Sequence, residues 1–214
     1  MDITASTPGR DRAFPALREA EMLRDPFAQF RAWLDEEIRA GLRLPVPMIA
    51  ATATRDGRPS VRTVLLNGFD ERGFVFYTNY ESRKGQELAE NSMGAVLFYW
   101  AGSGRQVRAE GPVVKTSVEE SDAYFRGRPR DSQLSAWASR QSEVIEGREV
   151  LEARVSELTD RFQGQDVPRP LFWGGYRVIP ETLEFWQSRP NRLHDRLRYR
   201  RLPDGHWRIE RLSP

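Results

Sequence analysis

The sequence predicts an α+β fold, in which short antiparallel strands form a barrel or a sandwich and helices pack around it. Candidate strands recur at intervals of about 8–12 residues, and turn residues separate them, as in all-β cores. Stretches with helical periodicity interrupt these strands, which makes the fold α+β by content. With 214 residues, of which 39% are hydrophobic, the chain suffices for one domain with a sizeable core.

The N-terminal part predicts an arm followed by a helix. Residues 1–24 carry no clear hydrophobic pattern, and we expect a flexible arm ahead of a single domain that spans residues 25–214. Asp25 and Pro26 are typical of an N-cap and a first helical turn. Apolar residues then follow at helical spacing until Gly41, where the helix is expected to end. These apolar residues are Phe27, Phe30, Trp33, Leu34 and Ile38.

Between residues 47 and 115 the pattern changes to short strands. Asp56 and Gly57 predict a tight hairpin turn. Gly68, Asp70 and Gly73 indicate a polar turn before the next strand. The expected strands cover residues 47–55, 59–66, 74–79, 94–101 and 105–115, and a short helix is expected over 82–90.

The second half of the chain predicts helices and then strands. Helical periodicity indicates three helices before the chain returns to alternating patterns. The helices are expected over residues 118–127, 131–140 and 147–162. Four strands are expected to complete the sheet, over residues 172–179, 182–187, 196–202 and 206–212.

The composition excludes several kinds of site. The chain has no cysteine, which excludes disulfides, thiolate nucleophiles and iron–sulfur clusters. Its two histidines, His194 and His206, lack the spacing of zinc ligands, so no metal site is expected. Because 33 basic and 31 acidic residues give a formal charge of +2, bulk charge does not indicate nucleic-acid binding. No apolar run approaches the roughly 20 residues of a membrane span, and no signal peptide is apparent, so we expect a soluble, cytoplasmic protein.

Cations beside predicted strands favour an anionic ligand. Arg83 and Lys84 follow a predicted N-cap, Ser82, and so stand where the helix dipole disfavours positive charge. A bound phosphate would reverse that penalty, because free N–H groups and cations at a helix N-terminus bind phosphate. Arg62 lies in an otherwise apolar strand and needs either solvent or an anionic partner. Solvated surface charges are the alternative interpretation of both segments.

A second basic segment lies near the C-terminus. Arg192, His194 and Arg196 share one face if the segment is extended. Three potential cations side by side favour a facing anion, and Trp186 could form one wall of a site for a flat ligand. The alternative is an exposed basic edge strand. Residues 124–133 combine arginines and hydroxyl groups around a proline-containing turn, which also suits phosphate recognition.

Together these segments resemble the pyridoxine (pyridoxamine) 5′-phosphate oxidase family. The resemblance covers residues 25–214 and implies an FMN-binding split β-barrel, mostly antiparallel, with peripheral helices. It also implies a homodimer with FMN at the subunit interface. The matching segments are RTVLLN (62–67), FVFYTNYESRKG (74–85), RQV (105–107), YFRGRPRDSQLSAWASRQS (124–142), FWGGYRV (172–178), EFWQ (184–187) and RLHDRLRY (192–199).

The resemblance also implies roles for individual residues. The substrate phosphate would be bound by Tyr124, Arg128 and Ser132, while Arg192 and His194 would lie against the pyridine ring as the catalytic residues. The FMN phosphate would be bound mainly by cations. The implied FMN contacts are Arg62, Tyr77, Thr78, Arg83, Lys84, Gln106, Gln141, Ser142, Trp186 and Arg196. We therefore expect Arg62, Lys84 and Arg196 to surround a shared cleft.

The family reaction implies that the C4′ alcohol or amine of pyridoxine or pyridoxamine 5′-phosphate gives a hydride to the flavin. Molecular oxygen would then reoxidise the flavin, with peroxide and pyridoxal 5′-phosphate as products. The flavin carries the electron chemistry, and the protein positions the substrate and neutralises phosphate.

Two departures from the family pattern leave other functions open. Asn67 stands where the family usually has a lysine that helps to bind the substrate phosphate. The N-terminal arm lacks the family's Arg-x-x-Tyr element, and Arg10 and Phe14 stand in that region. One alternative is a related flavin oxidase of another compound, similar to the phenazine-biosynthesis oxidases. Another is a non-catalytic carrier of flavin or pyridoxal phosphate.

Overall fold

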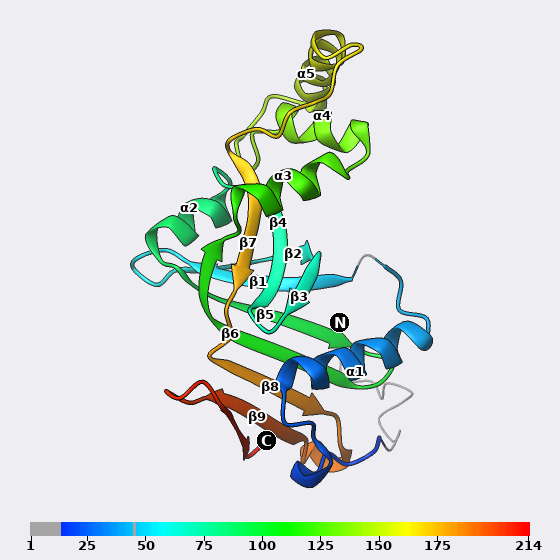
Figure 1. The fold of residues 1–214 in the computed structure, drawn as a ribbon, viewed down its shortest axis with the longest axis vertical. Coiled ribbons are helices and arrows are strands. Elements are labelled where there is room, and N and C mark those ends of the chain that lie inside the picture. The colour runs from blue at the N-terminus through cyan, green and yellow to red at the C-terminus, as the bar shows by residue number, and fades with distance from the viewer. Residues whose placement is uncertain (1–13, 45) are drawn as a thin grey trace, which may run out of the picture.

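The computed structural model describes residues 14–44 and 46–214 and shows a curled antiparallel half-barrel with helices around it (Figure 1). Its main path of neighbouring strands runs β10-β9-β8-β6-β5-β1-β2, while β3, β4 and β7 form a second group. The long β6 pairs with both β8 and β7, so it joins the two groups. The strands are β1 (Pro47–Ala53), β2 (Pro59–Leu65), β3 (Gly68–Asp70), β4 (Gly73–Asn79), β5 (Met93–Trp100), β6 (Arg105–Lys115), β7 (Trp173–Val178), β8 (Thr182–Gln187), β9 (Asp195–Arg201) and β10 (Trp207–Arg211). The predicted α+β split barrel is confirmed.

Five α-helices are described, and three of them gather at one end of the molecule. Figure 1 shows α3, α4 and α5 together, far from α1. The helices are α1 (Pro26–Arg39), α2 (Arg83–Glu90), α3 (Val118–Arg126), α4 (Arg130–Ala138) and α5 (Arg148–Arg161), with 3-10 turns at Glu19–Glu21 and Pro190–Arg192. None of the helices within the described ranges has the length and apolar character needed to cross a membrane.

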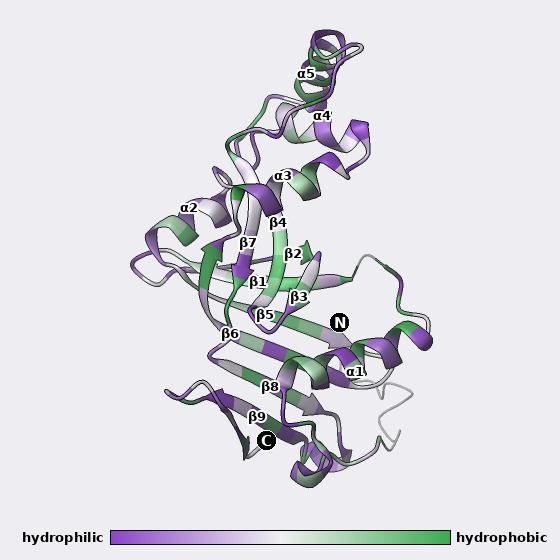
Figure 2. Ribbon diagram, in the orientation of Figure 1, coloured by the Kyte–Doolittle hydropathy of each residue, from purple (hydrophilic) through white to green (hydrophobic). Residues whose placement is uncertain are grey.

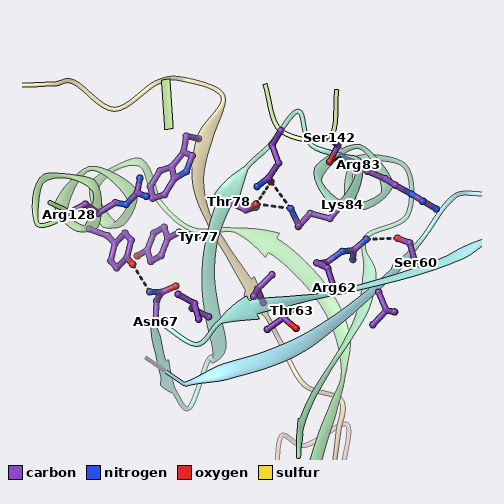
Figure 3. A pocket seen from close by; sticks show the side chains of 16 residues that line it. Ser60, Arg62, Thr63, Asn67, Tyr77, Thr78, Arg83, Lys84, Arg128 and Ser142 are labelled. Atoms are coloured by element: carbon purple, nitrogen blue, oxygen red, sulfur yellow. Dashed lines mark hydrogen bonds between the residues drawn. The ribbon is translucent and has the colours of Figure 1, made fainter. Parts of the chain in front are cut away.

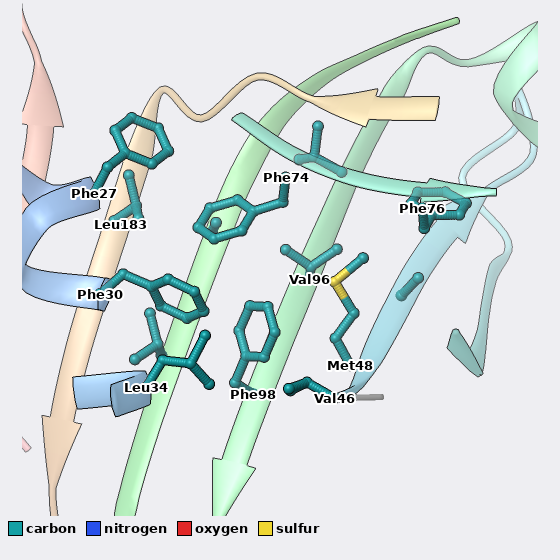
Figure 4. Packing of buried hydrophobic residues seen from close by; sticks show 14 of the residues in the cluster. Phe27, Phe30, Leu34, Val46, Met48, Phe74, Phe76, Val96, Phe98 and Leu183 are labelled. Atoms are coloured by element: carbon teal, nitrogen blue, oxygen red, sulfur yellow. The ribbon is translucent and has the colours of Figure 1, made fainter. Parts of the chain in front are cut away.

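The main core lies between α1 and the concave side of the sheet. Asp25 caps α1 by accepting hydrogen bonds from the Phe27 and Ala28 amides at 3.1 and 3.2 Å, as its sequence position predicts. The helix then turns Phe27 and Phe30 onto aromatic residues of the strands, among them Phe74 (Figure 4). Edge-to-face and tilted ring pairs of this kind stabilise a core beyond simple area burial.

The structure corrects two sequence expectations in this region. The helical pattern placed Ile38 on the buried face of α1, but Ile38 is partly exposed and Glu37 is buried beside it. Glu37 is tolerated there because the Arg105 guanidinium lies 3.7 Å from its carboxylate. The residues around Gly68 and Asp70 were expected to form only a turn, but they form β3, which is defined by its pairing with β4.

Residues 14–24 pack along the C-terminal strands. The Leu17 amide donates to the Asp195 carboxylate at 3.1 Å, and the Tyr199 hydroxyl donates to the Leu23 carbonyl at 2.7 Å. Residues 1–13 of the predicted arm, including Arg10, lie outside the described residues.

One face of the sheet carries exposed apolar side chains. Antiparallel partners that stand opposite each other lie on the same face, and the pairings of Ala51 with Val61, of Pro47 with Leu65 and of Ile49 with Leu97 put these side chains together. Val61 is 67% exposed, and Tyr99 on the same face of β5 is 59% exposed. This surface continues onto β6, β8 and β9, where most of the facing residues, such as Gln106, Glu184 and Arg196, are polar. Figure 2 shows a hydrophobic β4 and a largely hydrophilic β9.

Candidate functional site

A cavity of about 560 Å³ lies beside the edge strand β2 and is bordered by β4, α2 and α3. Its volume lies within the range typical of small-molecule sites. Figure 3 shows that its lining side chains divide into two ends. We call one the cation end, formed by Arg62, Thr78, Arg83, Lys84, Gln141 and Ser142. We call the other the aromatic end, formed by Asn67, Tyr77, Tyr124, Arg128 and Trp173.

Lys84 is the most deeply buried cation of the cation end, with only 7% of the residue exposed. Its ammonium donates to Gln141 Oε1 at 2.7 Å, to Thr78 Oγ1 at 3.0 Å and to Ser82 Oγ at 3.2 Å. Within the described residues it forms no ion pair with a carboxylate. Burial, followed by the nearby Arg62 guanidinium, lowers the pKa of Lys84 to about 8. A buried ammonium with only neutral partners is the kind of group that a bound anion stabilises.

A buried carboxylate, Glu87, holds the two arginines of this end. It lies 3.3 Å from the Arg62 guanidinium and 2.9 Å from that of Arg83, and its side chain is 3% exposed. Burial alone would raise the pKa of Glu87. Hydrogen bonds from Ser60, Thr52 and the two arginines outweigh this effect and lower it to about 2. Glu87 is therefore ionised at neutral pH, and it fixes both guanidinium groups beside the cavity.

The charged side chains of the cation end, together with Glu87, carry a net charge of +2. Three cations, Arg62, Arg83 and Lys84, stand against one carboxylate, Glu87. A phosphate monoester carries close to two negative charges at neutral pH, because its second pKa is about 6. The cation end therefore matches the charge of such a group and supplies the donors for charge-assisted hydrogen bonds.

The local sequence explains why these groups meet. Ser82 caps α2, since its hydroxyl accepts from the Gly85 amide at 3.4 Å, and the next two residues therefore open the helix beside the cavity. Gly85 permits a close approach to the preceding turn, because a Cβ there would stand 1.9 Å from the Tyr80 carbonyl oxygen. Ser142, with φ of 78°, accepts a hydrogen bond from the Arg83 amide at 3.2 Å and so links the loop after α4 to α2.

The aromatic end is built from parallel rings. Tyr77 and Tyr124 stack with their centroids 3.8 Å apart and their planes within 1°, and Trp173 lies nearly parallel to both. Asn67 Nδ2 donates to the Tyr124 hydroxyl at 2.6 Å. The guanidinium of Arg128 stacks on the Trp173 ring at 4.6 Å. Arg128 Nη1 is buried and has no hydrogen-bond partner within the described chain, and burial lowers the Arg128 pKa.

A second cavity of about 250 Å³ lies on the polar part of the sheet face. The buried Glu184 holds Arg196 through two oxygens, with contacts of 2.7 and 3.1 Å. His194 packs against the Trp186 ring at 4.6 Å, and its Nδ1 accepts from the Arg189 amide at 3.1 Å. In the neutral imidazole this leaves the proton on Nε2. The cavity is lined by Leu97, Gln106, Arg108, Glu184, Trp186, His194, Arg196 and Pro214.

The predicted FMN contacts are divided between the two cavities. Gln106, Trp186 and Arg196 line the second cavity. The others line the first cavity and are Arg62, Tyr77, Thr78, Arg83, Lys84, Gln141 and Ser142. Arg62, Lys84 and Arg196 therefore do not share a cleft within one chain, contrary to the sequence expectation. The reason is the strand order, because β2 lies at one end of the path and β9 lies next to the other end.

The predicted substrate contacts are divided in the same way. Asn67, Tyr124 and Arg128 line the first cavity, and His194 lines the second. Ser132 on α4 and Arg192 in the 3-10 turn line neither cavity, so their roles stay predictions.

Sequence reasoning missed two groups of this site. Glu87 looks like an ordinary helix-surface partner of Arg83, four residues away, and nothing local indicates that it is buried. Trp173 lies in a segment that carried the family resemblance, but no role was assigned to it.

Comparisons with known proteins identify the family of the chain. A family model described as pyridoxamine 5′-phosphate oxidase matches residues 34–162, and one described as the pyridoxine 5′-phosphate oxidase C-terminal dimerisation region matches residues 173–214. A pyridoxine/pyridoxamine 5′-phosphate oxidase of Rubrobacter xylanophilus is 64% identical over 89% of this chain and 87% of its own length. The protein of the same name from Gloeothece citriformis is 55% identical over the full length of both chains.

Solved structures show the same fold. PhzG from Burkholderia lata 383, in complex with tetrahydrophenazine-1-carboxylic acid, superposes with a TM-score of 0.86 at 35% identity and covers 95% of this chain and 100% of its own. An FMN-binding protein from Nostoc punctiforme, at 17% identity and a TM-score of 0.69 over 86% of this chain and 97% of its own, supports the fold alone. By its sequence matches and its split-barrel fold, the chain belongs to the pyridoxamine 5′-phosphate oxidase family.

Proposed function

We propose that this protein is an FMN-dependent oxidase that converts pyridoxine or pyridoxamine 5′-phosphate into pyridoxal 5′-phosphate, with molecular oxygen as the electron acceptor. One observation carries the proposal: a single cavity has a doubly charged cation end and, beside stacked aromatic rings at its other end, a guanidinium whose buried Nη1 has no hydrogen-bond partner among the described residues. Two anionic groups and flat rings between them are what FMN and a phosphorylated pyridine would together present. The high identity to relatives that carry this activity in their names supports the same conclusion.

The residues of the cation end fit the FMN phosphate. Lys84, Arg62 and Arg83 would hold it through charge-assisted hydrogen bonds, and the Ser142 hydroxyl stands beside them. Glu87 would keep the two arginines in place during binding, so that little side-chain entropy is lost. When bound, the flavin would supply the acceptor for two electrons and their transfer to oxygen.

A second copy of the chain would complete the site. We infer a homodimer because the family's dimerisation region is present and because exposed apolar side chains such as Val61 and Tyr99 lie on the same sheet face as the second cavity. Such a contact would bring Trp186 and Arg196 of one copy to the first cavity of the other. Trp186 would then form a wall against a flat ring, and His194 would hold a proton at Nε2 beside the substrate.

The substrate's anionic group would bind at the aromatic end. Arg128 is the cation there, without a carboxylate partner among the described residues, and Tyr124 lines the same end of the cavity. These groups would orient the pyridine ring and exclude water from one side of it, which is the protein's share of the catalysis. Arg192 of the partner copy would lie against the pyridine ring, and Ser132 would add a hydroxyl to the site of the anionic group.

A related oxidase of another aromatic compound is the second candidate function. Asn67 favours it, because the neutral amide weakens the aromatic end as a site for a phosphate dianion. The structural likeness to PhzG, whose structure contains a carboxylic acid ligand, favours it as well. A non-catalytic carrier has no comparable observation in its favour.

The deciding experiment is an oxygen-consumption assay on the purified protein with FMN. We expect turnover with pyridoxine or pyridoxamine 5′-phosphate and formation of pyridoxal 5′-phosphate. No turnover with either compound, in protein that holds one FMN per chain, would eliminate the proposal and favour the related oxidase. Failure to take up FMN would contradict the flavin site itself.

A further inference from the structure

We infer that Asn67 makes the aromatic end of the cavity an anion subsite of single charge, suited to a planar aromatic compound that carries a singly charged oxyanion. This inference rests on the proposed function, because it concerns the substrate's end of the same cavity. It adds that the subsite discriminates little between a carboxylate and a phosphate, and that the residue at position 67 sets this discrimination.

The first step is the charge of the subsite. Of the side chains that line the aromatic end, only Arg128 carries a formal charge. No carboxylate within the described residues pairs with its guanidinium, which instead stacks on Trp173 at 4.6 Å and on Phe125 at 5.7 Å. Its buried Nη1 lacks a hydrogen-bond partner there. A half-buried cation without a carboxylate partner attracts one negative charge, and a dianion would bring a second charge that stays unbalanced and loses part of its hydration.

The second step is the orientation of the Tyr124 hydroxyl. Asn67 Nδ2 donates to it at 2.6 Å (Figure 3), so the oxygen acts as the acceptor in this bond. The single hydroxyl hydrogen must then point elsewhere, and it can donate to an anion in the cavity. The Tyr124 ring is fixed by its stack on Tyr77 at 3.8 Å. The Asn67 backbone is fixed too, since its amide donates to the Val75 carbonyl at 2.9 Å.

The third step is the contrast with the cation end of the same cavity. There, Arg62, Arg83 and Lys84 stand against Glu87, which leaves two positive charges. The aromatic end has one. The cavity thus offers different charges to two anionic groups, and a phosphate dianion is matched at the cation end only. A lysine at position 67 would add a second charge to the aromatic end and remove the difference.

The test uses two small probes and the FMN-loaded protein. Benzyl phosphate and phenylacetate each carry one aromatic ring and one oxyanion, and at pH 7.5 the phosphate is mainly a dianion while the carboxylate is a monoanion. Calorimetric titration gives the dissociation constant of each probe for the wild type and for variants at position 67. Thermal unfolding of every variant verifies that it is folded.

For the wild type we expect the two dissociation constants to lie within about fivefold of each other. Asn67→Lys should tighten benzyl phosphate binding by about tenfold and phenylacetate binding by less than about threefold, since charge-assisted bonds are about twice as strong as neutral ones. This is a gain of affinity, which a misfolded variant cannot imitate. Arg128→Gln should weaken both probes by about tenfold or more.

A double-mutant cycle tests whether Asn67 acts through Tyr124. Asn67→Ala and Tyr124→Phe should each weaken both probes by about threefold to tenfold, and the double variant should be no weaker than Tyr124→Phe alone. Additive losses would overturn the orienting role of Asn67.

Three results would overturn the inference as a whole. One is a wild type that binds benzyl phosphate more than about fiftyfold tighter than phenylacetate, with no gain in Asn67→Lys. Another is unchanged binding in Arg128→Gln, and the third is no measurable binding of either probe. These results are distinct from a failure of the proposed function, which would appear as no FMN uptake or no oxidation of the phosphorylated pyridines. A protein that catalyses the oxidation but shows any of the three results contradicts this inference alone.

Discussion

Lys84 provides a sharp test of the cation end. Its replacement by methionine should weaken FMN binding but stabilise the FMN-free protein. The pKa of Lys84 falls from 10.5 to about 8. At about 1.4 kcal/mol per pH unit, the buried charge therefore destabilises the FMN-free protein by about 3 kcal/mol relative to a neutral lysine. With FMN bound, the same charge should contribute a charge-assisted hydrogen bond worth about 1.5–3 kcal/mol.

Lys84→Met should consequently weaken FMN binding by about tenfold to 150-fold. In FMN-free wild type, the unfolded state binds more protons than the folded state between pH 8 and 10.5, so stability should rise with pH there. In Lys84→Met, the stability of the FMN-free protein should not rise over this pH range. Flavin fluorescence titrations measure the affinity, and denaturant unfolding at several pH values measures the stability.

The chain supplies a matched control in Lys115, the other lysine of the sequence. Its ammonium lies 4.2 Å from the centroid of the Tyr80 ring, and it does not line the cavity. Lys115→Met should leave the FMN affinity unchanged. A loss of less than about threefold in Lys84→Met, or an equal loss in both variants, would refute the reasoning.

Three further predictions follow from the same structure. FMN affinity of the wild type should fall as pH rises through about 8, by about tenfold near pH 9, because Lys84 loses its proton; a flat profile in fluorescence titrations would contradict this. Gly85→Ala should destabilise the protein by about 1–3 kcal/mol in denaturant unfolding, since its Cβ would overlap the Tyr80 carbonyl; Gly68→Ala, where no atom lies within 4 Å of the added Cβ, is the control. Val61→Glu on the exposed apolar face should yield monomers in analytical ultracentrifugation and a reduced FMN affinity in fluorescence titrations; dimers of this variant would exclude this face as the interface.

Much of the fold could be predicted because its signals are local. Asp56 and Gly57 mark the β1–β2 hairpin, where Gly57 has a φ of 84°, and Asp25 and Ser82 cap helices at the predicted positions. β3 could not be predicted, since three residues carry no period of their own and the strand exists through its pairing with β4. The burial of Glu37 in place of Ile38 likewise depends on Arg105, which lies far away in the sequence.

The candidate site was predictable only where a residue is unfavourable in its local setting. Lys84 at a helix start and Arg62 in an apolar strand are unfavourable without an anion, and both line the cavity. Glu87 is favourable as a surface helix residue, so its burial against Thr52 and Ser60 gave no local signal. The placement of Arg196 depends on the order of strands in the sheet, which no single segment encodes.

The division of polar groups between two cavities of one chain has a consequence for mixed subunits. A chain with Lys84→Met keeps its second cavity, and a chain with Arg196→Ala keeps its first. In a mixed dimer of the proposed kind, one composite site would unite the two intact halves, while the other would unite the two damaged ones. Two parent proteins, each impaired at both of its sites, should therefore recover about a quarter of the wild-type sites when they are dissociated and reassembled at random.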